Sequence, residues 1–557
     1  MNEFELIIKP SSLTKFRKSK KYKSFKKNYI SGLSKNKFFP KKYKTLLLIA
    51  FILLIIIIIA TFIKKLIIKS SNNINQTKLV LKNNIYLTFN ENYNLTKEEN
   101  EISPFCNEFD PTYLFYFRMK NKEKTICDNG CSKHMCYQND DFNYNQIFYH
   151  KNGVICLMKN IVLDPLKSNP NKYVFNGPVD FTDHGFPLSS KGLFNMKCDS
   201  PNLIRNYESN YKYYFNSWNY EYQDEKENLE ELAPGKVIFF FSRCQDSPNL
   251  FHGVSEVINA ISMMELFNLK PEDIQVVFLD SITLDYKFDP LFDIFKNVIS
   301  RGGEPLYIKN LKKKYLISSA IHIPIGWDST LFLTNDIKYQ SPECKYPSRT
   351  FKFFNDLINK YLEIPTFSDS FVSDNEIFYY PKSVIEYHNS NNKFDKYITI
   401  QWRKPWPKVR RGQARILAKA PEIADKIASL VPKNYLVRLV DTGGLHLKKQ
   451  ISIMRNTDYL IGIHGAGLTL SIFMPSKSIL HEINQSSNMI VPRTMSILSG
   501  HKTFNDRVEA EIKKINDNEI VFFNIDELGK KVLDRMKEIN FIQTKHLTFK
   551  SKINYLR

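Results

Sequence analysis

A histidine flanked by closely spaced glycines is the segment of this 557-residue chain that points most directly to chemistry. Gly462, His464, Gly465 and Gly467 stand between two apolar runs, so we expect a strand that ends there and a helix that begins there. Glycine permits a tight turn and a close backbone approach. The first amides of a helix have no intrahelical partner, so the amides near Ala466 predict an anion site suited to phosphate. His464 can donate to a phosphate oxygen at the same place.

Placement alone leaves a second interpretation of this segment open. The glycines can serve only the close packing of a helix on a sheet, with His464 as a hydrogen-bonded polar residue. Other glycine motifs are excluded, because the order G-x-x-G-x-G is not the dinucleotide fingerprint and the chain contains no P-loop motif. The sequence His-Gly-Ala-Gly also occurs in esterases, but the G-x-S-x-G nucleophile motif that they require is absent.

The elements that must position His464 recur along the last third of the chain. We expect strands at 397–403, 435–441, 458–464, 478–483 and 519–525, and helices at about 412–430, up to about 455 and from about 526. Apolar strands that alternate with helices predict a parallel sheet covered on both faces. Arg403 falls at the end of the first of these strands, on the edge where such sheets bind ligands.

An earlier stretch repeats this rhythm. We expect strands at 236–243, 275–280, near 305 and from 315, with helices at about 247–269 and from 290. Residues 106 to about 235 are aromatic, contain cysteines and are broken by Asn, Pro and Gly, which predicts short strands and long connections. A polar segment at 364–395 separates the two patterns. The sequence therefore predicts an α/β fold with two Rossmann-like domains, 106–390 and 395–557, that face each other across a cleft.

The N-terminal part predicts a membrane anchor. Residues 45–63 contain no charge, and as a helix they reach about 28 Å, close to the thickness of a bilayer core. Residues 1–44 contain 14 Lys and Arg against Glu3 and Glu5, which accounts for +12 of the net charge of +22. This basic tail is interpreted as a topology signal that stays cytosolic and touches anionic lipid, and a nucleic-acid arm is the alternative. Residues 64–105 then form a stem outside the cytosol.

Cysteines and sequons agree with that topology. All eight cysteines follow the span, an even number that suits disulfides in an oxidising compartment. Their pairing is open, and a zinc site is the alternative for the cluster Cys127, Cys131, His134 and Cys136. N-glycosylation acceptor motifs also follow the span, at Asn75, Asn94 and Asn484.

The segment 458–483, with Gln450 before it and 415–423 further upstream, resembles the C-terminal half of the family-61 glycosyltransferases. A fainter similarity covers 236–270. The resemblance implies a GT-B-like enzyme that takes a sugar, N-acetylglucosamine or xylose, from a UDP-sugar and transfers it with inversion to a glycoprotein or glycan acceptor. No cofactor and no metal are expected, since such enzymes commonly stabilise the nucleotide diphosphate with helix N-termini and cationic side chains, and the chain has no Asp-x-Asp motif.

The resemblance also implies roles for individual residues. Arg403 and Arg415 would meet the negative charge that develops on the diphosphate, together with the amides of Gly465 to Gly467. Glu482 would accept hydrogen bonds from the ribose hydroxyls of the donor. Surface solvation for the arginines, and a capping or salt-bridge role for Glu482, are the alternatives.

Inversion requires a base, which the first half must supply. His252 and Glu256 are spaced i, i+4 near the start of a helix, so both can face one cleft, and the reference pKa of histidine, about 6.5, suits proton transfer. A capping or packing histidine with a solvated glutamate is the alternative. Asp280, at a strand end, is the reserve candidate.

Together these interpretations predict a single-pass type II glycosyltransferase of the Golgi or endoplasmic reticulum membrane, with its catalytic part in the lumen and no nucleic acid as partner. The alternative function is a catalytically inactive lumenal protein that binds carbohydrate or nucleotide sugar.

Overall fold

The computed structural model describes residues 106, 110–121, 123–128, 133–137, 155–168, 190–199, 201, 214–222, 229–243, 250–279, 291–324, 329, 331, 344–367, 377–390, 392–404, 415–484, 491–515 and 518–538. All of them belong to one compact unit, 85–557. The predicted tail, membrane span and stem lie outside these residues, as do Asn75, Asn94 and Asp280. No helix in the described part of the chain is long and apolar enough to cross a membrane.

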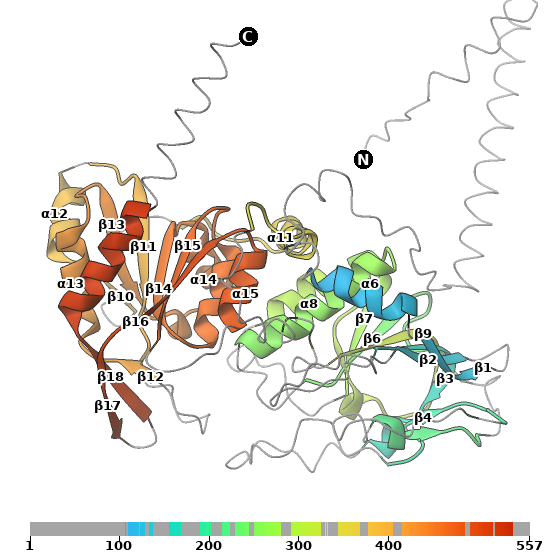
Figure 1. The fold of residues 1–557 in the computed structure, drawn as a ribbon. Helices are drawn as coiled ribbons and strands as arrows, with labels where there is room; N and C mark the ends of the chain where they lie inside the picture. Colours follow the sequence, from blue (N-terminus) through green and yellow to red (C-terminus); the bar gives the residue numbers. More distant parts are fainter. Residues whose placement is uncertain are drawn as a thin grey trace, which may run out of the picture. The chain divides into compact units, whose positions relative to one another are not determined.

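The first sheet follows the order β1-β2-β3-β9-β6-β7-β8, and β4 pairs with β3 and β5 (Figure 1). Its strands are β1 (Glu123–Asp128), β2 (Lys133–Tyr137), β3 (Ile155–Leu163), β4 (Phe194–Asn195), β5 (Trp218–Asn219), β6 (Val237–Phe241), β7 (Ile274–Phe278), β8 (Leu306–Tyr307) and β9 (Tyr315–Ile323). β6 pairs in parallel with β7 and β9, and β7 pairs in parallel with β8. The predicted strands are thus confirmed, and β1 to β3 extend the parallel part with antiparallel partners.

Burial explains why the parallel strands form where they do. Every residue of β6 and of β7 is buried, in runs of β-branched and aromatic side chains that suit a sheet covered on both faces. Helix α8 (Leu250–Leu266) supplies part of that cover, and sixteen of its seventeen residues are buried. It packs against α6 (Pro111–Asn121), α11 (Arg349–Tyr361) and β9, so it is buried nearly all round although it contains several polar residues.

Two features tie the start of this region to α11. Cys106 and Cys344 form a disulfide, and Asp110 accepts hydrogen bonds from the amides of Thr112 and Thr350. One carboxylate therefore serves the first turns of both α6 and α11. Burial raises the pKa of Asp110, against the effect of its hydrogen bonds with Thr350.

Two further disulfides lie in the irregular region, Cys127–Cys198 and Cys136–Cys156. The prediction of disulfides is confirmed for these residues, and the zinc alternative is wrong for Cys127 and Cys136, because their sulfurs are bonded to other cysteines. His134, Cys136 and Cys156 lie close together, but two of the three form a disulfide, so this group does not offer thiolate ligands.

The second sheet follows the order β10-β13-β11-β14-β15-β16. Its strands are β10 (Phe378–Tyr379), β11 (Lys396–Gln401), β13 (Tyr435–Val440), β14 (Tyr459–Ile463), β15 (Ile479–Asn484) and β16 (Lys502–Arg507). All pairings are parallel except that of β10 with β13. The predicted strands at 397–403, 435–441, 458–464 and 478–483 are confirmed, and β16 is an addition. β10 and α12 (Lys382–Asn389) precede residue 395 yet pack with this sheet.

One predicted helix begins later than expected. Residues 415–417 form β12 (Arg415–Leu417) and pair with β18 (Asn518–Phe523), which also pairs with β17 (Ala510–Ile515) in a small third sheet. Helix α13 (Ala420–Leu430) starts only after Lys419, whose φ of 52° is left-handed. Pro421 lies in the first turn of α13, where its missing N–H costs no hydrogen bond, so the proline sets the start.

The two main sheets share an apolar layer. A single cluster of buried side chains includes residues of β6, α8 and α11 together with residues of α14 (Leu447–Arg455), the 3₁₀ helix η10 (Ala466–Phe473) and α15 (Val491–Leu498). Within it, α8 packs directly against η10. The segment that follows His464 is therefore anchored to both halves of the described chain.

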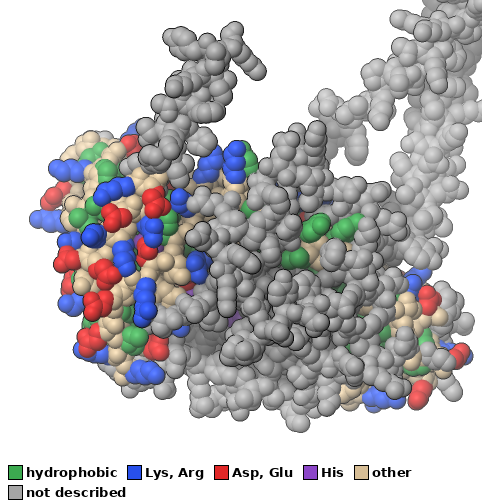
Figure 2. Space-filling view, in the orientation of Figure 1, with side chains coloured by type: hydrophobic (Ala, Val, Ile, Leu, Met, Phe, Trp, Pro, Cys, Tyr) green, Lys and Arg blue, Asp and Glu red, His purple; other side chains and the backbone are tan. Residues whose placement is uncertain are grey.

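The described surface of the second half is mixed in charge. Figure 2 shows Lys and Arg side chains interspersed with Asp and Glu side chains over the part that contains α12 and α13 in Figure 1. Such a pattern is typical of a solvated surface. It fits the assignment of more than half of the net charge to residues 1–44.

Candidate functional site

The candidate site lies where the parallel strands of the second sheet end. β11 is followed by Trp402 and Arg403, β13 by Asp441, and β14 by His464. The carboxyl ends of neighbouring parallel strands meet at one edge, and open α/β sheets bind ligands there. Because β11 and β14 are paired directly, Arg403 and His464 are brought together.

The glycines of this segment are required by close contacts. A Cβ atom at Gly465 would lie 2.8 Å from Cζ of Arg403, and one at Gly467 would lie 2.7 Å from Cδ of Gln401. A Cβ at Gly462 would lie 2.7 Å from a methyl group of Leu468. These contacts agree with the packing interpretation and leave the anion site open, and the same close approach brings Arg403 against the backbone of the turn.

The helix that follows is a 3₁₀ helix, η10, and its first intrahelical bond runs from the Leu468 amide to the Gly465 carbonyl, at 3.0 Å. The amides of Ala466 and Gly467 precede that bond and are not used inside the helix. These two amides stand at the position where the sequence predicts an anion site.

Two guanidinium groups converge on this turn. Nη1 of Arg403 and Nη1 of Arg415 both donate to the carbonyl oxygen of His464, at 2.9 and 3.1 Å. Arg415 also forms an ion pair with Glu519 at 3.4 Å. Among the described residues no carboxylate pairs with Arg403. Burial and, to a smaller extent, the charge of Arg415 lower the pKa of Arg403 to about 10, so it stays charged at neutral pH.

His464 contacts a buried carboxylate. Its Nδ1 pairs with Oε1 of Glu482, and Oε2 of Glu482 forms an ion pair with Nε of Arg493 at 2.9 Å. Glu482 is fully buried, whereas 11% of the His464 side chain is exposed. Burial lowers the pKa of Arg493, against the effect of Glu482. Ribose binding by Glu482, as predicted, requires one of these two partners to move.

Summed over the described residues, this cluster has an excess of positive charge. Arg403, Arg415 and Arg493 contribute three charges, and Glu482 and Glu519 offset two of them. One net positive charge remains with His464 neutral, and a second appears if the imidazole takes up a proton. Two free amides and an uncompensated guanidinium at one sheet edge can bind a phosphate or diphosphate.

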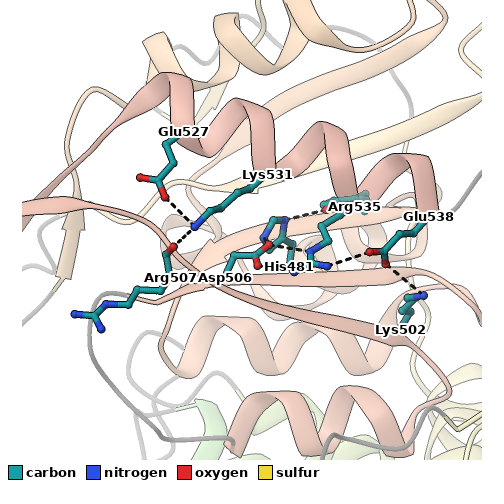
Figure 3. A network of polar contacts seen from close by, with 9 residues as sticks. His481, Lys502, Asp506, Arg507, Glu527, Lys531, Arg535 and Glu538 are labelled. Carbon is teal, nitrogen blue, oxygen red and sulfur yellow. Dashed lines mark hydrogen bonds and ion pairs between the residues drawn. The ribbon is translucent and has the colours of Figure 1, made fainter.

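The residue next to Glu482 belongs to a different network. Side chains alternate along a strand, so His481 points to the opposite face of the sheet from Glu482. Figure 3 shows His481 beside Asp506, which Arg535 of helix 525–538 contacts in turn. This network anchors the last described helix and takes no part in the candidate site.

The predicted base candidates are buried. His252 and Glu256 are on α8 with exposures of 5% and 1%, beside residues of the apolar cluster. Burial lowers the pKa of His252 to about 3, so it is neutral at physiological pH. The i, i+4 spacing holds, but other elements cover this face of the helix. Asn484, the described sequon, is also buried, which leaves little room for a glycan.

Sequence reasoning missed Gln401, Arg493 and Glu519. Gln401 ends β11 and was detectable by the same rule as Arg403, since it stands at the carboxyl end of an apolar strand. Glu519 and Arg493 reach the site from β18 and α15, and nothing in their spacing from His464 indicates this.

This part of the chain is similar to known proteins. Residues 330–480 match the family Glycosyltransferase 61. A segment of 90 residues is 32% identical to the EGF domain-specific O-linked N-acetylglucosamine transferase of Drosophila melanogaster. That alignment covers 15% of this chain and 17% of the relative, so the chain matches about a sixth of the relative's length.

The family match contains Gln401, Arg403, Arg415, His464 and the glycines of the turn, while Glu482, Arg493 and Glu519 lie beyond it. The resemblance seen in the sequence is confirmed, and the residues that converge on the turn belong to the matched part. Through residues 330–480, this chain is therefore similar to the glycosyltransferase 61 family.

Proposed function

We propose that this protein transfers a sugar, N-acetylglucosamine or xylose, from a UDP-sugar to a glycoprotein or glycan acceptor, with inversion at the anomeric carbon. The observation that carries the proposal is the convergence of Arg403 and Arg415 on the turn after His464, inside the family match. The two main α/β sheets are compatible with a GT-B-like arrangement in which this turn belongs to the donor-binding half.

The proposed chemistry depends on charge that develops on the leaving group. When the bond between sugar and diphosphate breaks, negative charge accumulates on the diphosphate oxygens. Amides and guanidinium groups that are already oriented stabilise this charge without having to reorganise. Arg403, Arg415, the amides of Ala466 and Gly467 and the imidazole of His464 supply these groups. A metal ion is not required by this scheme, since side chains provide the positive charge.

The proposed location is the lumen of the Golgi or endoplasmic reticulum, with residues 45–63 as a type II anchor. The three disulfides support an oxidising compartment. The matched Drosophila relative is named for its action on EGF domains, which supports a secretory-pathway glycoprotein as the proposed acceptor.

The test is release of UDP from a panel of UDP-sugars by the full-length protein in detergent. We expect UDP-N-acetylglucosamine or UDP-xylose to be consumed, and Arg403→Ala to lower kcat by about 10²- to 10³-fold, the usual effect of removing one oriented charge-stabilising group. His464→Ala should also lower it. Arg301→Ala is the matched control, because Arg301 pairs with Glu272 on the surface of the first half.

Equal rates for wild type and Arg403→Ala would contradict the proposed site. Binding of UDP without release from any UDP-sugar would instead select the alternative, a catalytically inactive protein that binds nucleotide sugar.

A further inference from the structure

The contact between His464 and Glu482 is built into the pairing of two central strands. Gly462 of β14 lies opposite Glu482 of β15, and five consecutive residue pairs hold this register. Two residues beyond Gly462, Nδ1 of His464 contacts the carboxylate of Glu482. The pair is therefore positioned by the sheet and not by a flexible loop.

The carboxylate of Glu482 lies between the imidazole of His464 and the guanidinium of Arg493. Its second oxygen lies 2.9 Å from Nε of Arg493, and neither oxygen is exposed to water. Glu482 is the anion of an ion pair with Arg493, and a carboxylate in an ion pair only accepts hydrogen bonds. His464 must then present a proton to it, so the proton of the neutral imidazole is on Nδ1.

We infer that Glu482, supported by Arg493, is a positioning residue that fixes the proton of His464 on Nδ1 and leaves Nε2 as the atom that meets the donor diphosphate. This inference rests on the proposed function and replaces ribose binding as the role of Glu482. Nε2 of a neutral imidazole is an acceptor and repels a phosphate oxygen. Binding of the diphosphate therefore requires Nε2 to take up a proton from the solvent and become a donor.

The charges around His464 decide how this proton is held. Glu482 is the carboxylate in contact with the imidazole, Arg403 and Arg415 donate to the His464 carbonyl, and Glu519 offsets Arg415. Glu482 and an incoming diphosphate are the anions beside the ring, and Arg403 and Arg415 are the nearby cations. Proton uptake is therefore coupled to nucleotide binding, and the coupling depends on Glu482.

The first measurement concerns the free protein. Full-length protein labelled with ¹⁵N-histidine, in detergent, is studied by NMR at neutral pH, and His464 is assigned by comparison with His464→Gln. The imidazole ¹⁵N shifts distinguish the two tautomers. We expect the proton on Nδ1, and a proton on Nε2 would overturn the inference.

The second measurement is calorimetric binding of UDP in two buffers of different ionisation enthalpy. Wild type should take up protons on binding, and Glu482→Gln should take up fewer and bind about 10- to 100-fold more weakly, the range found when the carboxylate partner of a metal-bound histidine is removed. Unchanged proton uptake in Glu482→Gln would also overturn the inference.

Asp506→Asn is the matched control. Asp506, on β16, is a buried carboxylate that contacts His481, the neighbour of Glu482 in β15. Because His481 points to the opposite face of the sheet from Glu482, proton uptake by Asp506→Asn should equal that of wild type. If wild type binds no UDP, the proposed function fails, while the NMR measurement still decides the tautomer.

Discussion

At the scale of single residues, burial separates the candidates for catalysis. His252 and Glu256 lie inside the core, and the pKa of His252, about 3, makes it a weak base. Asp280 lies outside the described residues, two positions after the last residue of β7 in the sequence. We propose this reserve candidate from the sequence as the base to test next.

The corresponding prediction separates acceptor chemistry from donor binding. Asp280→Asn should lower the rate of transfer to an acceptor by about 10²- to 10⁴-fold, the usual contribution of a general base, and leave the affinity for UDP unchanged. His252→Gln should lower the rate less. Rates of transfer and UDP affinity for both variants check this, and an equal loss in the two would refute the assignment.

The donor turn was accessible to sequence reasoning, and its neighbours were not. Gly465 and Gly467 could be recognised in the sequence as a tight turn, because glycines that follow the end of a strand usually allow a tight turn or a close backbone approach. Glu482 belongs to a strand whose six residues are all buried, so no alternation of polar and apolar residues shows which way its carboxylate points. His252 and Glu256 show the same limit, because spacing places two side chains on one face but does not tell whether that face is covered.

At the scale of elements, the last described helix, 525–538, is tied to the second sheet by the Asp506 network. Arg535 contacts both oxygens of Asp506, at 2.7 and 3.0 Å, and His481 contacts Asp506 from the other side, at 3.0 Å (Figure 3). Burial alone would raise the pKa of Asp506, but the interactions with His481 and Arg535 outweigh it and hold the pKa well below its usual range.

This arrangement predicts how stability depends on pH. The folded state keeps Asp506 ionised at a pH where the unfolded chain, with a pKa near 3.9, binds a proton. Its contribution is therefore present above about pH 4 and is lost as the pH falls further. Asp506→Asn should lower the free energy of unfolding by about 1 to 3 kcal/mol at pH 7, the range for hydrogen bonds to charged groups, and by less at pH 3.

Urea titration followed by tryptophan fluorescence at the two pH values measures this difference. Glu527→Gln is the control, because Glu527 pairs with Lys531 one helical turn away at a more exposed position, so its removal should change the free energy of unfolding much less. The same loss at both pH values would contradict the role of Asp506.

Helices and strands were predictable where the local sequence pattern is clear. They were missed where a strand depends on a pairing partner far away in the sequence. Strands β6, β7, β11 and β13 are apolar runs bounded by polar residues, and all were found. β12 was taken as the start of a helix because its three residues gain their hydrogen bonds from β18, about a hundred residues later. Pro421 was the local signal for the true start of α13.

At the scale of the whole molecule, topology is open to a direct test. If residues 45–63 span the membrane with the tail in the cytosol, Asn75 and Asn94 are in the lumen. Full-length protein made in eukaryotic cells should then lose apparent mass in two steps when Asn75→Gln and Asn94→Gln are combined. Asn484→Gln should leave the glycan content unchanged, since Asn484 is buried. Absence of glycans from both stem sites would contradict the proposed topology.

The shared apolar layer has a consequence for attempts to change specificity. Because α8 packs against η10, the donor turn is seated partly on a helix that the first half contributes. A chimera that joins the second half of this chain to the first half of another transferase would remove that seat. Module exchange at a boundary near residue 390 should therefore succeed only when the residues of α8 that pack against η10 are also carried over.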